Sequence, residues 1–118
     1  MFKLFSRNKT ADIKPDYSVL KTDMHSHLLP GIDDGSPDLP TSIELIRGMM
    51  SLGYSKFITT PHIMWDMYQN TRDIILARLD ILRNGLQLEG IQVPVHAAAE
   101  YFLDDYVVCS AKKEFQTL

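Results

Sequence analysis

Hydrophobic residues recur at helical spacing in two parts of the chain. Ile43, Ile46 and Met50 form the first set, and the second set is spaced by four, three and four residues: Ile75, Leu79, Leu82 and Leu86. Such spacing places apolar side chains on one face of a helix. The pattern predicts one helix that starts between residues 36 and 41 and a second helix over residues 71–88.

The residues that flank these sets are typical of helix ends. Thr41 and Glu44 fit a capping box in the first helix, and Gly53 suits a left-handed end. The second helix has candidates at both ends: Asn70 or Thr71 for its start and Gly90 for its end. We therefore expect two helices with defined boundaries.

Shorter apolar runs alternate with these helices and are typical of strands. They are residues 17–27, 56–60 and 91–99, and residues 103–118 are expected to be helical without a clear boundary. Strands that alternate with helices predict a parallel sheet joined by right-handed crossovers. We expect an α/β domain over residues 17–118, preceded by a flexible arm over residues 1–16.

Composition excludes several classes of protein. The 118 residues carry a net charge of -3, which does not suggest the basic face of a nucleic-acid binder. No apolar stretch approaches the roughly 20 residues that span a bilayer, and the start lacks the apolar segment of a secretory signal. We therefore expect a cytoplasmic protein with no nucleic-acid partner and no membrane span.

The single cysteine, Cys109, argues against two kinds of chemistry. One cysteine cannot form an internal disulfide. A cysteine-dependent phosphatase loop would need an arginine six positions further on, where this chain has Phe115. We expect Cys109 to behave as a small apolar residue.

Histidines and a carboxylate stand where the predicted strands end. His25 and His27 end the first strand, His62 follows the second and Glu100 follows the third. The carboxyl ends of parallel strands form one rim, where ligands bind. Residues two apart in a strand point to the same face, so His25 and His27 can converge. Imidazoles with carboxylates suit zinc, manganese or iron, and we therefore predict a metal site.

Other polar residues near this rim have alternative roles. Asp23 can reach the metal, orient an imidazole, or be a polar residue at the start of a strand. Asp33 and Asp34 lie in a loop, and we expect one to bind metal and the other to form the turn. His96 is expected to be a core or hydrogen-bonded histidine.

Aromatic and basic residues near the rim leave a choice open as well. The aromatic residues either line a substrate pocket or simply pack: Trp65, Tyr68, Tyr101 and Phe102. Arg47 and Arg72 are candidates to pair with a phosphate, but a single arginine on a helix is usually solvated. We therefore assign neither arginine to the site.

Three motifs in this order resemble those of a known superfamily. They are Asp23–Gly35 (DMHSHLLPGIDDG), Thr59–His62 (TTPH) and Ala97–Tyr101 (AAAEY). The chain resembles the polymerase and histidinol phosphatase (PHP) superfamily, and within it the bacterial tyrosine-protein phosphatases of capsule and exopolysaccharide synthesis. The resemblance runs from Asp23 to the end of the chain.

The resemblance implies a fold and a set of site residues. The fold is a distorted, TIM-like β/α barrel of the PHP type that holds a cluster of divalent ions, often manganese. By motif the metal ligands are expected to be His25, His27, Asp34, His62 and Glu100, with Asp34 and His62 also expected to be catalytic.

The resemblance also implies a reaction and a partner. A metal-bound hydroxide would attack the phosphoryl group without a cysteine intermediate. The substrate would be a phosphotyrosine protein, namely a bacterial tyrosine kinase that regulates polysaccharide export.

The length of the chain limits these expectations. A β/α barrel typically needs about 200–250 residues, whereas this sequence predicts about three βα units. We therefore expect residues 17–118 to be the N-terminal part of the barrel domain. Two alternatives remain: a small-molecule phosphatase of the histidinol phosphatase type, and a non-catalytic metal-binding fragment that assembles as a homo-oligomer.

Overall fold

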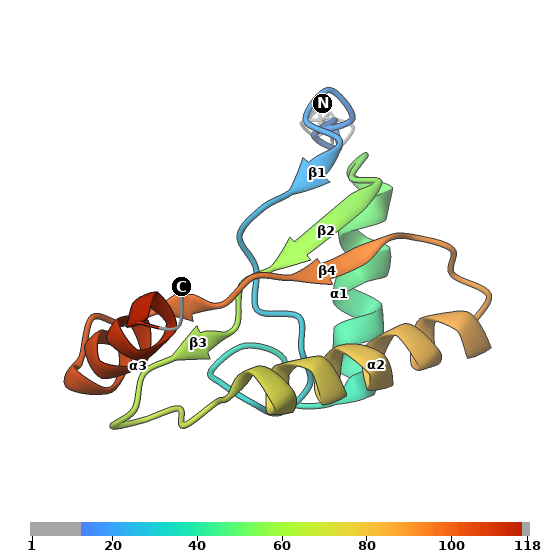
Figure 1. Ribbon diagram of the computed structural model, residues 1–118. Coiled ribbons are helices and arrows are strands. Elements are labelled where there is room, and N and C mark those ends of the chain that lie inside the picture. Colours follow the sequence, from blue (N-terminus) through green and yellow to red (C-terminus); the bar gives the residue numbers. More distant parts are fainter. Residues whose placement is uncertain (1–12, 117–118) are drawn as a thin grey trace, which may run out of the picture.

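Strands and helices alternate along the chain in a computed structural model, which describes residues 13–116 (Figure 1). The elements in order are β1 (Thr22–Asp23), α1 (Leu39–Ser51), β2 (Lys56–Thr59), β3 (His62–Ile63), α2 (Arg72–Leu88), β4 (Val95–Ala97), β5 (Glu100–Tyr101) and α3 (Asp105–Gln116). The predicted helices over residues 71–88 and 103–118 correspond to α2 and α3. Of the predicted arm, residues 1–12 lie outside the described part of the chain.

All strand pairs are parallel, which confirms the α/β class. β2 lies between β1 and β4 in a three-stranded sheet, and β3 pairs with β5 in a second sheet. The register places Thr59 opposite Ala97 and His62 opposite Glu100. Segments far apart in the sequence are thereby brought side by side at their carboxyl ends.

The β2–β4 pair continues into the β3–β5 pair, and a proline interrupts the ladder between them. The amide of Ala98 donates to the carbonyl of Thr59 (3.0 Å), and that of Glu100 donates to the carbonyl of Pro61 (2.9 Å). Pro61 has no N–H with which to return a bond, so the regular ladder stops there. Strand pairing resumes at His62. The sequence predicted His62 to follow the strand over residues 56–60, whereas it begins a short strand of its own, β3.

Two predicted strands are much longer than the observed ones. The first was expected over residues 17–27, but β1 covers only Thr22–Asp23, because residues 18–20 form a turn and Lys21 has a positive φ of 61°. The third was expected over residues 91–99, but β4 begins only after Pro94. Apolar composition alone does not show where a strand has a partner.

The ends of the helices agree with prediction at most positions. Gly53 and Gly90 have φ values of 108° and 69° just beyond α1 and α2, and the Thr71 side chain caps α2. The predicted capping box at the start of α1 is wrong. Asp38 caps that helix instead and accepts from the amide of Thr41 at 2.9 Å.

The apolar stripes of α1 and α2 form the core together with β2 and β4. The buried hydrophobic side chains are Leu28, Leu29, Ile43, Ile46, Phe57, Ile63, Ile75, Leu79, Leu82, Leu86 and Val95. The four predicted positions of α2 are all among them. Leu28 and Leu29 follow His27 directly, so burial of this pair fixes the segment that carries this histidine.

Residues at the margins of the fold differ from expectation. His96 is exposed rather than buried, because β4 is the edge of its sheet and the side chain of Val95 takes the buried face. Arg47 is not merely solvated, since it bridges Glu44 on α1 and Glu89 beyond α2 at 2.7 Å each. Within residues 13–116, no helix has the length and apolar character needed to cross a membrane.

We predict that truncating a buried side chain of α2 destabilises the fold and that truncating an exposed side chain of the same helix does not. Leu82 is fully buried and Leu88 is 89% exposed on the same helix. Leu82→Ala should lower the free energy of unfolding by about 2–5 kcal/mol, and Leu88→Ala should change it by less than about 0.5 kcal/mol. Denaturant unfolding followed by circular dichroism measures both, and equal effects would contradict this packing.

Candidate metal centre

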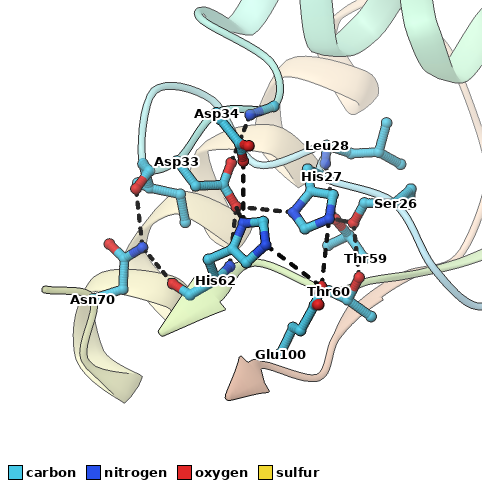
Figure 2. Close-up of polar contacts among 12 residues, drawn as sticks. Ser26, His27, Leu28, Asp33, Asp34, Thr59, Thr60, His62, Asn70 and Glu100 are labelled. Carbon is cyan, nitrogen blue, oxygen red and sulfur yellow. Dashed lines mark hydrogen bonds and ion pairs between the residues drawn. The ribbon is translucent and has the colours of Figure 1, made fainter. Parts of the chain in front are cut away.

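The carboxylate of Glu100 lies close to all three histidines of the predicted site, and Figure 2 shows it beside His27 and His62. Its Oε2 atom lies 3.5 Å from Nε2 of His25, 3.6 Å from Nε2 of His27 and 3.7 Å from Nε2 of His62. His27 and His25 reach this point from the segment after β1, and the other two residues begin β3 and β5. The parallel register places His62 beside Glu100, and the segment after β1 brings His25 and His27 to the same carboxylate.

The aspartates lie on the opposite side of two stacked rings. The imidazoles of His27 and His62 are 4.4 Å apart and inclined by 17°. Nδ1 of His27 lies 3.0 Å from Asp33 Oδ2, and Nδ1 of His62 lies 3.1 Å from Asp34 Oδ1. Each ring thus presents Nδ1 to an aspartate and Nε2 to Glu100.

Asp33 is the most enclosed acid of the cluster, with a side chain that is only 1% exposed. It accepts hydrogen bonds from the His27 ring, from the amide of His62 and from the amide of Gly35, all at 3.0 Å. Burial raises the pKa of the Asp33 carboxyl, but these bonds outweigh burial, and the pKa lies below its usual value. Asp33 therefore stays ionised and orients His27.

Asn70 ties the loop that carries the aspartates to the strand that carries His62. Its buried side-chain amide donates to the carbonyls of Ile32 (2.9 Å) and His62 (2.8 Å). Sequence reasoning considered Asn70 only as a helix cap, a role that Thr71 fills. A polar residue just before a helix carries no signal that distinguishes these two roles.

Asp23 does not join the cluster. It accepts a hydrogen bond from the hydroxyl of Ser26 at 2.5 Å and belongs to neither group of clustered metal-binding side chains. Of its three alternative roles, these contacts fit a polar residue of the strand rather than a metal ligand or a partner of an imidazole. Its bond to Ser26 instead spans and stabilises the bend at His25.

The aromatic residues near the rim divide between the site and the packing. The Tyr68 ring stacks on His62 at 5.6 Å, and burial, followed by the charges of Asp34 and Asp33, raises its phenol pKa. Trp65 instead packs on Tyr106 of α3 at 3.8 Å. Tyr101 and Phe102 are more than half exposed. Of these four aromatic residues, Tyr68 is the one whose ring stacks on a residue of the cluster in the described part of the chain.

The residues of the cluster fit a divalent metal. Within the described part of the chain, two buried side-chain atoms lack a hydrogen-bond partner, Nδ1 of His62 and Oε2 of Glu100, and both point into the cluster. Unpaired buried polar atoms are unfavourable unless a further group binds them. Ligand atoms around a tetrahedral ion with bonds of about 2.1 Å lie about 3.4 Å apart, close to the separations around Glu100.

Two overlapping sets of donors meet at His27. One contains His25, His27 and Glu100, and the other contains His27, Asp33, Asp34 and His62, with the donor atoms of each set within 4.8 Å of one another. Imidazole nitrogens with carboxylate oxygens match the preferences of zinc, manganese and iron. The arrangement can hold metal, polarise an anionic ligand and move a proton.

Comparison with known proteins now assigns the chain to a family. The model of a family described as "Capsular polysaccharide synthesis, CpsB/CapC" matches residues 21–118. The chain belongs to the CpsB/CapC family. This agrees with the resemblance that its three motifs suggested.

Individual relatives of the CpsB/CapC family share part of their length with this chain. The tyrosine-protein phosphatase YwqE of Bacillus subtilis is 36% identical over 63% of this chain and 28% of its own. The tyrosine-protein phosphatase CpsB of Streptococcus agalactiae is 26% identical over 81% and 40%. CapC of Staphylococcus aureus is 24% identical over 78% and 36%.

A solved structure supports the same assignment. It comes from the work on YwqE from Bacillus subtilis and CpsB from Streptococcus pneumoniae, described as metal-dependent tyrosine phosphatases. The match has a TM-score of 0.70 and 32% identity and covers 78% of this chain and 37% of the other. The chain thus spans about a third of the length of the relatives that it matches.

We predict that a methyl group is tolerated at one exposed glycine and not at another. A Cβ at Gly35 would collide with the Cβ and carbonyl of His27, whereas a Cβ at Gly48 on α1 meets nothing within 4 Å. Gly35→Ala should cost about 1–3 kcal/mol and weaken binding of a divalent metal, while Gly48→Ala should stabilise the chain by up to about 1 kcal/mol. Thermal unfolding and calorimetric titration test the pair, and a Gly35→Ala chain with wild-type stability would contradict the close approach to His27.

Proposed function

We propose that the protein to which this chain belongs is a metal-dependent protein-tyrosine phosphatase and that residues 17–118 supply part of its metal centre. One observation supports this most directly. The buried atoms Nδ1 of His62 and Oε2 of Glu100 lack hydrogen-bond partners and face other donors. YwqE and CpsB, the solved relatives, are metal-dependent tyrosine phosphatases.

We propose the following roles for the clustered residues. His25, His27 and Glu100 hold one metal, with His62 and Asp34 binding beside them, while Asp33 acts mainly by orienting His27. When bound, a divalent ion would polarise the phosphoryl oxygens and make a coordinated water more acidic.

Asp34 and His62 are also the proposed catalytic residues. The Asp34 side chain is 62% exposed, so its carboxylate lies where the cluster opens to solvent. Its Oδ1 atom is 3.1 Å from Nδ1 of His62 without a hydrogen bond between them, so each group can exchange a proton with a water or leaving group that enters the cluster. This pair can therefore accept a proton from water and pass one to the leaving group, without a part for the exposed Cys109.

Manganese is the metal that we propose, with zinc and iron as alternatives. Mixed imidazole and carboxylate donors accept all three ions. More than one ion is expected, because His27 belongs to two sets of donors.

The proposed substrate is a phosphotyrosine protein, a tyrosine kinase that controls capsular or exopolysaccharide synthesis. The support is the CpsB/CapC family, whose description is capsular polysaccharide synthesis, and the tyrosine-phosphatase names of YwqE and CpsB. A cytoplasmic location is part of the proposal, because an exposed free cysteine suits a reducing compartment. We also propose that about three βα units seen here belong to a larger β/α barrel.

We predict that this protein releases phosphate from a phosphotyrosine peptide only when a divalent metal is present. Glu100→Gln and His27→Ala should each lower kcat/KM by more than about 100-fold, since removal of a ligand exceeds the usual effect of its supporting groups. His96→Ala is the matched control, because His96 is an exposed histidine outside the cluster.

Phosphate release with and without chelator measures this prediction. Activity that survives chelation and both substitutions would contradict the metal centre. Faster hydrolysis of histidinol phosphate than of the phosphotyrosine peptide would favour a small-molecule substrate.

A further inference from the structure

The segment that carries His25 and His27 runs beside β2 after its own strand has ended. β1 stops at Asp23, yet the amide of Thr60 donates to the carbonyl of Ser26 at 2.6 Å. In a parallel ladder, the residue that donates to Ser26 would also accept from the amide of Leu28 through its carbonyl. Here that second bond is made by a side chain.

Thr59 supplies the missing partner. Its Oγ1 atom accepts from the amide of Leu28 at 2.9 Å and donates to the carbonyl of Ser26 at 2.7 Å. The side chain is fully buried at the end of β2, on the same face as Phe57. One hydroxyl therefore binds the residue before His27 and the residue after it (Figure 2).

We propose that Thr59 is a positioning residue for His27. The two bonds fix the backbone on both sides of the histidine, and Asp33 holds Nδ1 of the ring at 3.0 Å. With three points held, Nε2 is directed at Glu100. The role of His27 as a ligand rests on the proposed function. The two bonds of Thr59, here called the clamp, are a property of the metal-free chain.

The chemistry of the clamp distinguishes it from ordinary core packing. Valine has nearly the shape of threonine but can neither donate nor accept, so Thr59→Val would leave Ser26 with fewer donors and Leu28 with none in this geometry. Serine keeps the hydroxyl and loses only a methyl group. A packing role predicts that valine is tolerated better than serine, and a positioning role predicts the reverse.

Two control variants separate the clamp from general loss of stability. Thr60→Val removes the neighbouring hydroxyl, which lies 3.3 Å from the Ser26 carbonyl, and retains the Thr60 amide that makes the shorter bond. Ile46→Val trims a fully buried side chain of α1 in the core. Neither change touches both neighbours of His27.

The first measurement is made on the metal-free 118-residue chain. Amide exchange at Leu28 and the ¹⁵N shifts of the His27 ring are recorded by NMR. In Thr59→Val we expect faster exchange at Leu28 and altered ring shifts, while Thr59→Ser and both controls remain like the wild type. Unchanged exchange and ring shifts in Thr59→Val would overturn the proposal. If that variant does not fold, rapid exchange of Leu28 in the wild-type chain would overturn it instead.

The second measurement is manganese affinity by calorimetry at a temperature where every variant is folded. Loss of a group that orients a ligand weakens metal binding by about 10-fold or more, which we expect for Thr59→Val, with recovery in Thr59→Ser. Equal loss in Ile46→Val or Thr60→Val would overturn the positioning role. A wild-type chain that binds no manganese would contradict the proposed function, and the NMR result would still decide the clamp.

Discussion

The rest of the site depends on the hydrogen bonds that the carboxylate of Asp33 accepts. This carboxylate lies almost completely out of solvent and accepts hydrogen bonds from three segments: the ring of His27, the amide of Gly35 and the amide of His62. A buried charge is stable only when such donors surround it. Asp33 therefore joins the segment that carries His27, its own loop and the start of β3 at one charged group.

Other buried polar groups act in the same way around this point. Thr59 joins the His27 segment to the end of β2, and Asn70 joins the aspartate loop to His62. Each uses a side chain to bond backbone groups that lie outside regular ladders. Such bonds are directional, so they fix the positions of the ligand-bearing segments more precisely than apolar contacts would. The apolar core of α1 and α2 supports them from one side (Figure 1).

Several predictions succeeded because they used local or periodic information. The α2 stripe was buried as its spacing required, and the glycines after α1 and α2 took left-handed conformations. The convergence of His25 and His27 was expected for a partly mistaken reason. Strand alternation cannot place them, since β1 ends at Asp23. The segment instead follows β2 through the bonds of Thr59 and Thr60.

By itself, the sequence determined the α/β class, the helices and the candidate ligands at the strand ends, because periodicity and motif order are local properties of the chain. Only the tertiary structure decided what each acid does. Asp33 and Asp34 are adjacent and chemically identical, yet one is buried under three donors and the other faces solvent beside His62. Their difference arises from the His27 ring and from the amide of His62, which is 29 residues further on and is placed by the parallel register.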